Sequence, residues 1–377
     1  MKKKLLILTA SYGTGHITAA KSIQQMISLK YPEIETKIVD VLLLHKKDKN
    51  LDKQTFIQKL YNFSMEKPII FDVFFFLTNN KLCTSILNLI MLLKNYNATK
   101  NLLDEFKPDI IVSTHPYWNF LIKKYKKEVK NIPYICVITD SYMIHKAWID
   151  RFVDYYFVID EDTKHVLINN NIKNIYVTGF PVNYKLFEKV EKEKIIKELE
   201  LDLDVNKKII LITIGLGATS RFIEIIEYLK DIENNFQLII ITGKYKDIYD
   251  YLTTKVKFKP KTKIIGWTDK MYNFLKISDI VICKAGGAIV SEALSCGVPV
   301  FIPLFVPAQE KGNVYIVKKY QMGFYEEDIE KVYKILDDII FDRINLKIYK
   351  ENIKKFIKDN PALIISNLIN RILNNLI

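Results

Sequence analysis

The chain has 377 residues, of which 49% are hydrophobic and 26% charged, and this composition excludes a disordered protein. The length exceeds what one ordinary core holds, so we expect two domains. No window approaches the roughly 18 uninterrupted apolar residues that a membrane-spanning helix needs. The net charge of +13 indicates either an anionic partner, such as nucleic acid or an anionic membrane, or a lysine-rich compositional bias.

The amino terminus, MKKKLLILTA, imitates a signal peptide. Its apolar run is too short, however, and SYGTGH follows where a cleavage site would stand. The four cysteines (Cys83, Cys136, Cys283 and Cys296) are far apart, which predicts free thiols in a reducing compartment and no zinc site. We therefore expect a cytoplasmic protein without a signal peptide or a transmembrane helix.

Short β-rich runs alternate with helical stretches along the whole chain. The first set of predicted strands lies at 4–9, 35–41, 109–114, 134–140 and 155–160. The second set lies at 208–215, 236–243, 262–267, 279–284 and 299–303. Continuous apolar strands separated by helices indicate parallel sheets that are covered on both faces.

A charged, glycine-free segment at 188–208 separates the two sets of strands. We therefore predict an amino-terminal domain of residues 1–187 and a carboxyl-terminal domain of residues 188–377. The chain ends in NPALIISNLINRILNNLI, an amphipathic helix that is free to pack back onto the first domain.

Glycine is scarce, with 12 residues in the chain, and most of them follow a predicted strand. Ligands bind beyond the carboxyl ends of strands in open parallel sheets, so these turns are expected to bring backbone close to a ligand.

The first turn, Gly13-Thr14-Gly15-His16, lacks the third glycine of a dinucleotide fingerprint, although Asp40 stands where a ribose-binding acid would. A nicotinamide-dependent dehydrogenase is therefore the weaker interpretation. His16, on the first turn of a helix, fits a group that faces a cleft, where the helix N-terminus favours an anion.

The segment at 278–313 has the features of a nucleotide-sugar site. A strand runs into Lys284-Ala285-Gly286-Gly287 and a helix follows, so that its first N–H groups can hold a diphosphate. Glu292, one and a half turns into that helix, can accept both hydroxyls of a ribose. Two further features complete the set. Gln309, Glu310 and Asn313 have side chains suited to sugar hydroxyls. Gly266 and Trp267 end a strand, where the backbone can pair with the edge of a base.

The stretches KAGGAIVSEALSCGVPV and PAQEKGN resemble the K-x-G-G/P-x-x-x-x-E-A-L and G-Q-E-x-x-N patterns of a family of GT-B glycosyltransferases. This family comprises the monogalactosyldiacylglycerol synthases and the processive diacylglycerol glucosyltransferases. SYGTGHITAA is similar to the family's S-x-G-x-G-H-x-x-A-A, and PDIIVSTHP and TDSYMIHKAWI resemble two further signatures. The chain departs from the family in the loop at 215–220, which has fewer glycines, and at Ala308, which replaces a glycine.

The resemblance implies an α/β protein of the GT-B fold, with two Rossmann-like, doubly wound domains facing a central cleft. The first domain would hold the acceptor and the second the UDP-sugar. The implied reaction is inverting transfer of glucose or galactose from a UDP-sugar to diacylglycerol at the membrane, with no metal and no cofactor besides the donor. The residues expected to contact the donor are Gly15, His16, Gly217, Ala218, Gly266, Trp267, Lys284, Ala285, Gly286, Gly287, Ala288, Glu292, Gln309, Glu310 and Asn313.

An inverting transfer needs a general base for the acceptor hydroxyl and stabilisation of the charge on the departing diphosphate. The candidate bases are His115, Asp140, His16 and His145. His115 and Asp140 directly follow predicted strands, and we expect His115 to be the base, although a turn histidine before proline is the structural alternative. His145 and Trp148 are expected to line the acceptor side.

A long connection between the second and third strands contains the aromatic run FDVFFFL. Aromatic residues combined with positive charge predict peripheral insertion into an anionic leaflet, and internal packing of apolar helices is the alternative. The residues expected at the membrane are Phe71, Phe74, Phe75 and Phe76. The predicted partners are diacylglycerol and the anionic cytoplasmic face of the cell membrane, without nucleic acid or an obligate protein partner. The rival functions are transfer to a polyprenyl-linked acceptor and non-catalytic binding of nucleic acid.

Overall fold

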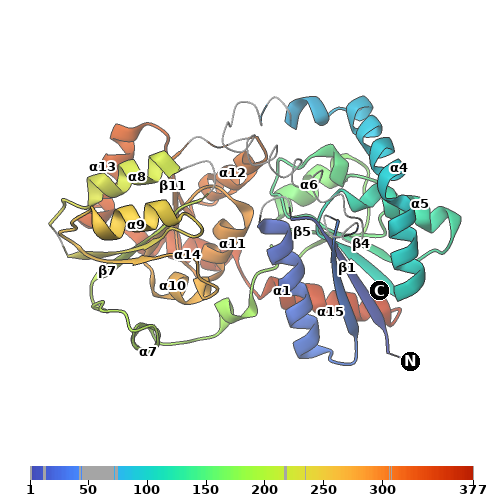
Figure 1. Ribbon diagram of the computed structural model, residues 1–377, viewed down its shortest axis with the longest axis horizontal. Helices are drawn as coiled ribbons and strands as arrows, with labels where there is room; N and C mark the ends of the chain where they lie inside the picture. The colour runs from blue at the N-terminus through green and yellow to red at the C-terminus, as the bar shows by residue number, and fades with distance from the viewer. Residues whose placement is uncertain are drawn as a thin grey trace. The chain divides into compact units, whose positions relative to one another are not determined.

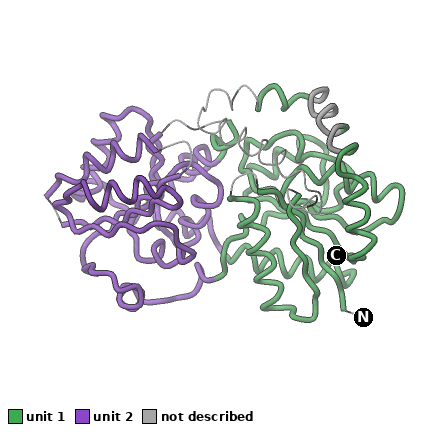
Figure 2. Tube along the Cα trace, viewed as in Figure 1, with its two compact units in different colours: residues 1–184, 307–312, 359–377 green, residues 185–306, 313–358 purple. Residues whose placement is uncertain are grey.

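The computed structural model describes most of the chain in two compact units (Figures 1 and 2). The described residues are 2–11, 14–41, 44, 72, 75–215, 219–233, 235–304, 306 and 308–376; in the helix at 81–106, the side chains of 81–88, 90 and 91 are not described. Unit 1 comprises Met1–Tyr184, Pro307–Gly312 and Asp359–Ile377, and unit 2 comprises Lys185–Val306 and Asn313–Lys358.

Unit 1 is built on a parallel sheet in the order β2-β1-β3-β4-β5-β6. The strands are β1 Lys4–Thr9, β2 Glu35–Asp40, β3 Ile110–Ser113, β4 Tyr134–Val137, β5 Tyr155–Val158 and β6 Ile175–Val177. The chain passes from β1 to β2 on one side and then returns to form β3 on the other side of β1. The carboxyl ends of β1 and β3 therefore form a topological switch point, which is where open α/β sheets bind ligands.

Helices cover both faces of this sheet (Figure 1). Helix α1 (Gly15–Lys30) and helix α15 (Pro361–Leu373) pack together on one face. The other face is covered by α4 (Lys81–Phe106), α5 (Trp118–Glu128) and α6 (Glu161–Asn169). A short 3-10 helix, η2 (Lys146–Trp148), joins the α4 and α5 side of the core.

Helix α15 begins where its sequence predicts a start. Asn360 caps it, with the side-chain Oδ1 accepting from the N–H of Ala362 at 3.0 Å, and Pro361 occupies the first turn. Ile365 and Ile369, one turn apart, are fully buried against α1 and the sheet. The end of the chain is therefore part of the core of unit 1.

Unit 2 repeats the doubly wound plan, with a parallel sheet in the order β12-β11-β10-β7-β8-β9. The strands are β7 Lys208–Thr213, β8 Phe236–Ile241, β9 Lys261–Ile265, β10 Ile280–Ile282, β11 Val300–Ile302 and β12 Gly323–Tyr325. The helices are α7 Lys192–Glu198, α8 Thr219–Leu229, α9 Lys246–Thr254, α10 Met271–Ile277, α11 Gly287–Ser295, α12 Lys311–Lys319, α13 Ile329–Ile340 and α14 Leu346–Phe356. Here β7 lies between β8 and β10, so the switch point falls between the carboxyl ends of β7 and β10.

The predicted fold class, GT-B with two doubly wound parallel sheets, is confirmed. The predicted strands match ten of the observed ones to within a few residues, but the short edge strands β6 and β12 were not predicted. In the part of the chain that the structure describes, no helix is long and apolar enough to span a bilayer.

A substitution in α15 tests how much the packing of this helix stabilises unit 1. Ile369→Ala removes a fully buried side chain, and we expect the free energy of unfolding of unit 1 to fall by about 2–5 kcal/mol. Leu29→Ala is the matched control, because Leu29 lies on α1 with 58% of its surface exposed and should change stability by less than about 0.5 kcal/mol. Equal losses in the two variants, measured by denaturant unfolding, would contradict the packing described here.

Candidate active site

Three ionisable side chains follow neighbouring strands at the switch point of unit 1. His16 comes after β1 in the first turn of α1, His115 comes directly after β3, and Asp140 follows β4. The imidazole rings of His16 and His115 are 4.5 Å apart between centroids and meet edge to face at 76°. The structure thus brings together the predicted catalytic candidates of the first domain.

The ring of His16 is held by two oxygen atoms. Its Nδ1 lies 2.8 Å from the carbonyl oxygen of Thr114 and 2.8 Å from the Oγ1 of Thr139. A carbonyl can only accept, so Nδ1 carries the proton and donates it. The neutral ring then has its lone pair on Nε2, which has no hydrogen-bond partner within the described part of the chain.

His115 has the opposite arrangement. Its Nδ1 accepts the backbone N–H of Tyr117 at 3.1 Å. The neutral ring therefore carries its proton on Nε2. Burial lowers the pKa of both histidines, and the proximity of His16 lowers that of His115 further, so both rings are neutral near pH 7.

Asp140 is the acidic member of this cluster. The indole Nε1–H of Trp148 donates to its Oδ2 at 2.7 Å. Burial raises the pKa of Asp140, while His16 and the Trp148 hydrogen bond lower it and Glu310 raises it. In return, the charge on Asp140 raises the pKa of His16 against the larger effect of its burial. Trp148, expected to line the acceptor side, is fully buried and holds this carboxylate.

His145 occupies a structural position. Its Nδ1 accepts the N–H of Ala147 at 3.1 Å, its Nε2 lies 3.3 Å from the Oγ1 of Thr78, and its ring packs 5.2 Å from that of Phe75. Burial, with a smaller contribution from Lys146, lowers its pKa to about 4. Both ring nitrogens of His145 are thus engaged.

The aromatic run expected at the membrane is only partly described, because Phe71 and Phe74 lie outside the described residues. Phe75 is buried against His145, whereas 58% of the surface of Phe76 and 62% of that of Leu77 are exposed. Large apolar side chains are also exposed on α4, where Leu89 and Leu93 are 57% and 79% accessible.

The lysine-rich helix α5 carries less unpaired charge than its sequence suggests. Lys123 pairs with Asp150 at 2.7 Å and Lys126 pairs with Asp154 at 2.5 Å. These partners lie in the loop between η2 and β5, and they offset much of the positive field of the helix. Positive charge on α5 is therefore a weak argument for binding to an anionic surface.

In unit 2, the predicted diphosphate turn lies at the switch point. Gly286 is the N-cap of α11, and Gly287 and Ala288 form its first turn, so their N–H groups are available to an anion. The amide of Asn313 donates to the carbonyl of Ala285 at 2.8 Å and fixes the turn. Two residues expected in the neighbouring loop after β7, Gly217 and Ala218, lie outside the described residues.

Lys284 and Glu292 flank this turn. The Lys284 side chain lies over Gly215, where an added Cβ would come within 2.8 Å of its Cδ. Gly215 follows β7, so a larger residue there would push the Lys284 side chain from its place. Glu292 is half-buried on α11, and burial raises the pKa of its carboxyl to about 7.

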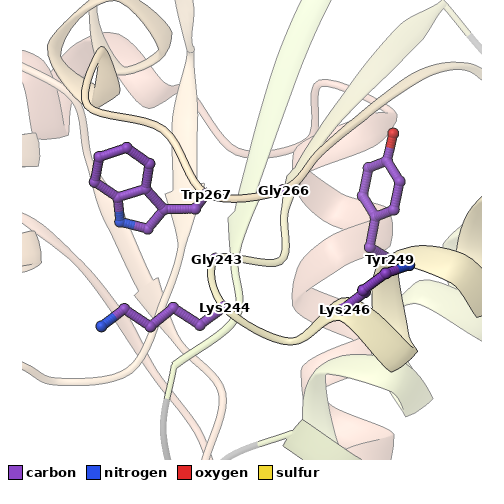
Figure 3. Close-up of a pocket in the computed structure, with 6 residues that line it drawn as sticks. All are labelled: Gly243, Lys244, Lys246, Tyr249, Gly266 and Trp267. Carbon is purple, nitrogen blue, oxygen red and sulfur yellow. The ribbon is translucent and has the colours of Figure 1, made fainter.

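A cavity of about 420 Å³ opens at the carboxyl ends of β8 and β9 (Figure 3). It is lined by Gly243, Lys244, Lys246, Tyr249, Gly266 and Trp267. Trp267 is 67% exposed, and Figure 3 shows Lys244 extending toward the same side of the two turns. Gly266 and Trp267 were predicted here; Lys244, Lys246 and Tyr249 were not, although the glycine after β8 marks the turn that carries the lysines.

The loop with the remaining sugar-binding candidates belongs to unit 1. It forms the 3-10 helix η4 (Ala308–Glu310), in which Gln309 is half-buried and Glu310 is buried. Its backbone touches the β4 side of the unit, since a Cβ on Gly312 would lie 1.8 Å from the carbonyl oxygen of Ser141. Only glycine allows this contact, which brings Glu310 near Asp140.

The backbone next to His16 is open on the side where a side chain of residue 15 would lie. An added Cβ on Gly15 would meet no atom within 4 Å among the described residues, so the backbone at the start of α1 borders open space. No group of three or more histidine, cysteine or acidic side chains within the described ranges is arranged to hold a metal ion.

Comparison with known proteins places both halves of the chain among glycosyltransferases. Residues 16–182 match the model of the monogalactosyldiacylglycerol (MGDG) synthase family, and residues 192–356 match that of glycosyl transferases group 1. The processive diacylglycerol beta-glucosyltransferase of Bacillus licheniformis is 27% identical, over 96% of this chain and 93% of that protein.

Solved structures share the fold at low sequence identity. MurG of Acinetobacter baumannii has a TM-score of 0.60 at 12% identity, covering 98% of this chain and 99% of its own. MnaA of Staphylococcus aureus, solved with UDP, has a TM-score of 0.64 at 15% identity, covering 99% and 97%. With the two family models, these similarities identify the chain as a glycosyltransferase of the GT-B fold, whose amino-terminal half matches the monogalactosyldiacylglycerol synthase family.

The lowered pKa of the half-buried His145 predicts a pH dependence of stability. The unfolded chain binds a proton there near the ordinary value of 6.5 and the folded chain only near pH 4. The unfolded state therefore holds more protons between these values, and the free energy of unfolding falls as the pH falls from about 6.5 to about 4. His145→Gln removes this titration and should make the decline shallower, by at most about 1.4 kcal/mol per pH unit. Parallel curves for the wild type and the variant in denaturant unfolding would contradict the lowered pKa of His145.

Proposed function

We propose that this glycosyltransferase moves glucose or galactose from a UDP-sugar to diacylglycerol at a membrane surface, with inversion at the anomeric carbon. The near full-length similarity to the Bacillus licheniformis processive diacylglycerol beta-glucosyltransferase supports the acceptor. The UDP in the MnaA structure, on the same fold, supports a uridine nucleotide donor. The observation that carries the chemical proposal is the Nε2 lone pair of His16, held beside open backbone at the switch point of unit 1.

Unit 2 binds the donor in this proposal. The N–H groups at the start of α11 and the ammonium of Lys284 stabilise the diphosphate and the charge that develops on it as the sugar leaves. Glu292 accepts the ribose hydroxyls, and binding would have to keep its carboxylate ionised against the effect of burial. The uracil ring occupies the cavity beside Trp267, against the backbone of Gly266.

His16 is the general base. The acceptor oxygen forms its bond to the anomeric carbon while the bond from that carbon to the phosphate oxygen breaks, and the hydroxyl proton passes to Nε2 of His16. Thr114 and Asp140 stabilise the imidazolium, because both raise the pKa of His16. His115, with its proton on Nε2, is suited to donate a hydrogen bond rather than to take a proton. The hydrogen bonds thus favour His16 as the general base, whereas the sequence predicted His115.

The acceptor arrives from a bilayer. Phe76 and Leu77, together with Leu89 and Leu93 on α4, provide exposed apolar side chains for insertion among acyl chains. An apolar surface that enters the bilayer only at the headgroup level would leave the diacylglycerol hydroxyl within reach of the protein. The excess of positive charge over the whole chain, +13, favours an anionic leaflet.

A product assay tests the function. Purified protein is mixed with anionic vesicles that contain diacylglycerol, UDP-glucose and UDP-galactose are offered separately, and the lipids are resolved. We expect a new glycolipid from one of the two donors, and a ladder of products would mean processive transfer. Transfer to a polyprenyl phosphate acceptor but not to diacylglycerol would overturn the proposed acceptor and favour the rival transferase. A folded protein without affinity for UDP would overturn the donor site.

A further inference from the structure

A buried side-chain amide in unit 1, that of Asn119, has no role in the function proposed above. Asn119 is the second residue of α5, four residues after His115, and 2% of its surface is exposed. Its Nδ2 donates to the backbone carbonyls of Ala147 at 3.0 Å and of Trp148 at 3.2 Å. An amide nitrogen carries two hydrogens, so both are used on consecutive carbonyls of η2.

The oxygen of the same amide is fixed as well. The hydroxyl of Tyr134 donates to the Oδ1 of Asn119 at 2.8 Å, and the thiol of Cys136 lies 3.8 Å from that oxygen. Tyr134 and Cys136 belong to β4, so the amide joins α5, β4 and η2. Because a buried polar group without a partner is costly, these hydrogen bonds restrict the amide to one orientation.

The backbone that this amide holds carries the indole of Trp148. The hydroxyl of Tyr156 also lies 2.9 Å from the carbonyl oxygen of Trp148, so two donors converge on that oxygen. Between centroids, the fully buried indole is 6.2 Å from the ring of His16 and 6.4 Å from that of His115. Its Nε1–H donates to Asp140 at 2.7 Å. The indole therefore adjoins both histidines and holds the carboxylate.

We propose that Asn119 is a positioning residue that holds the Trp148 indole against Asp140 and next to the two histidines. A hydrogen bond to a carboxylate is strong only when it is well aligned, so a displaced η2 weakens the bond to Asp140. Transfer then slows, although the substrates still bind. This inference rests on the proposed function, because it assumes that Asp140 stabilises the protonated His16 during transfer.

The pH dependence of kcat distinguishes positioning from a general structural effect. The ionisable groups that bear on Asp140 are His16 on α1 and Glu310 in η4, and His115 adjoins the same indole. The hydrogen bond from Trp148 lowers the pKa of Asp140, so loss of this bond raises that pKa. Because the active form needs the carboxylate ionised, the acid limb of kcat then moves to higher pH. A general loss of active protein lowers kcat at every pH and leaves the limb in place.

The test measures kcat for glycolipid formation on diacylglycerol vesicles as a function of pH. Asn119→Ala should lower kcat about 10- to 100-fold with the KM for the UDP-sugar kept, and should move the acid limb up by about one pH unit. Tyr125→Phe is the matched control and should keep the wild-type profile, since the Tyr125 hydroxyl, also on α5, donates to Asp104 and not to η2. In a Trp148→Phe background, which lacks the indole N–H, Asn119→Ala should cause no further shift of the limb.

A spectroscopic measurement reports on the same contact without turnover. The chain has three tryptophans, so the indole N–H groups of protein labelled with ¹⁵N-tryptophan give three resonances, and Trp148→Phe assigns one of them. Asn119→Ala should shift the Trp148 resonance upfield and speed its exchange with solvent. Trp118, whose Nε1–H donates to the carbonyl of Thr9, should keep its resonance. Should Asn119→Ala fail to fold, Asn119→Ser takes its place, because a serine hydroxyl has one hydrogen and cannot donate to both carbonyls.

The two measurements separate this inference from the proposed function. An unmoved Trp148 resonance, a wild-type pH profile in Asn119→Ala, or a further shift in the double variant would overturn the inference while the proposed function stands. A wild-type protein that makes no glycolipid from either donor would overturn the proposed function. The Trp148 resonance would then still show whether Asn119 holds the indole.

Discussion

The hydrogen bond from Nδ1 of His16 to the carbonyl of Thr114 is the interaction on which the candidate active site depends. It joins the first turn of α1 to the end of β3, and Thr139 adds the end of β4 through the same nitrogen. Thr114 returns the contact, since its Oγ1 donates to the backbone carbonyl of His16 at 3.0 Å. Three strand ends are thereby tied together, and the tautomer of one histidine is set.

The two histidines have opposite tautomers, so the Nε2 of His16 is suited to accept a proton and the Nε2 of His115 to donate a hydrogen bond. Burial keeps both rings neutral near pH 7, so each ring has one nitrogen that donates a hydrogen bond and one that accepts. Asp140 works against that burial at His16 alone, because its charge raises the pKa of His16 and so favours the state in which that ring has accepted a proton. Trp148 favours the ionised form of this carboxylate by donating to it, against the larger effect of burial, which raises the pKa of Asp140. In the proposed mechanism, three neighbouring turns supply the base, a hydrogen-bond donor and the charge that stabilises the protonated base.

The sequence was sufficient to predict the fold and to single out three candidate residues that the structure places at one edge of the first sheet. The interior strands are continuous apolar runs with buried neighbours on both faces, whereas β6 and β12 are three-residue edge strands without such a pattern. His16, His115 and Asp140 were predicted together because each follows a strand. Their roles could not be predicted, since the tautomers depend on backbone groups: the carbonyl that fixes His16 belongs to Thr114, 98 residues away. Likewise, nothing local to Asn119 indicates its hydrogen bond to the carbonyl of Trp148, 29 residues away.

The central claim is that His16, and not His115, takes the proton from the acceptor. The most direct measurement is the kcat for glycolipid formation on diacylglycerol vesicles by His16→Gln and His115→Gln, with the affinity for UDP measured in parallel. We predict that His16→Gln lowers kcat by about 10²–10⁴-fold, that His115→Gln lowers it much less, and that both variants bind UDP as the wild type does. The reverse order, with His115→Gln almost inactive and His16→Gln active, would contradict this account and make His115 the base.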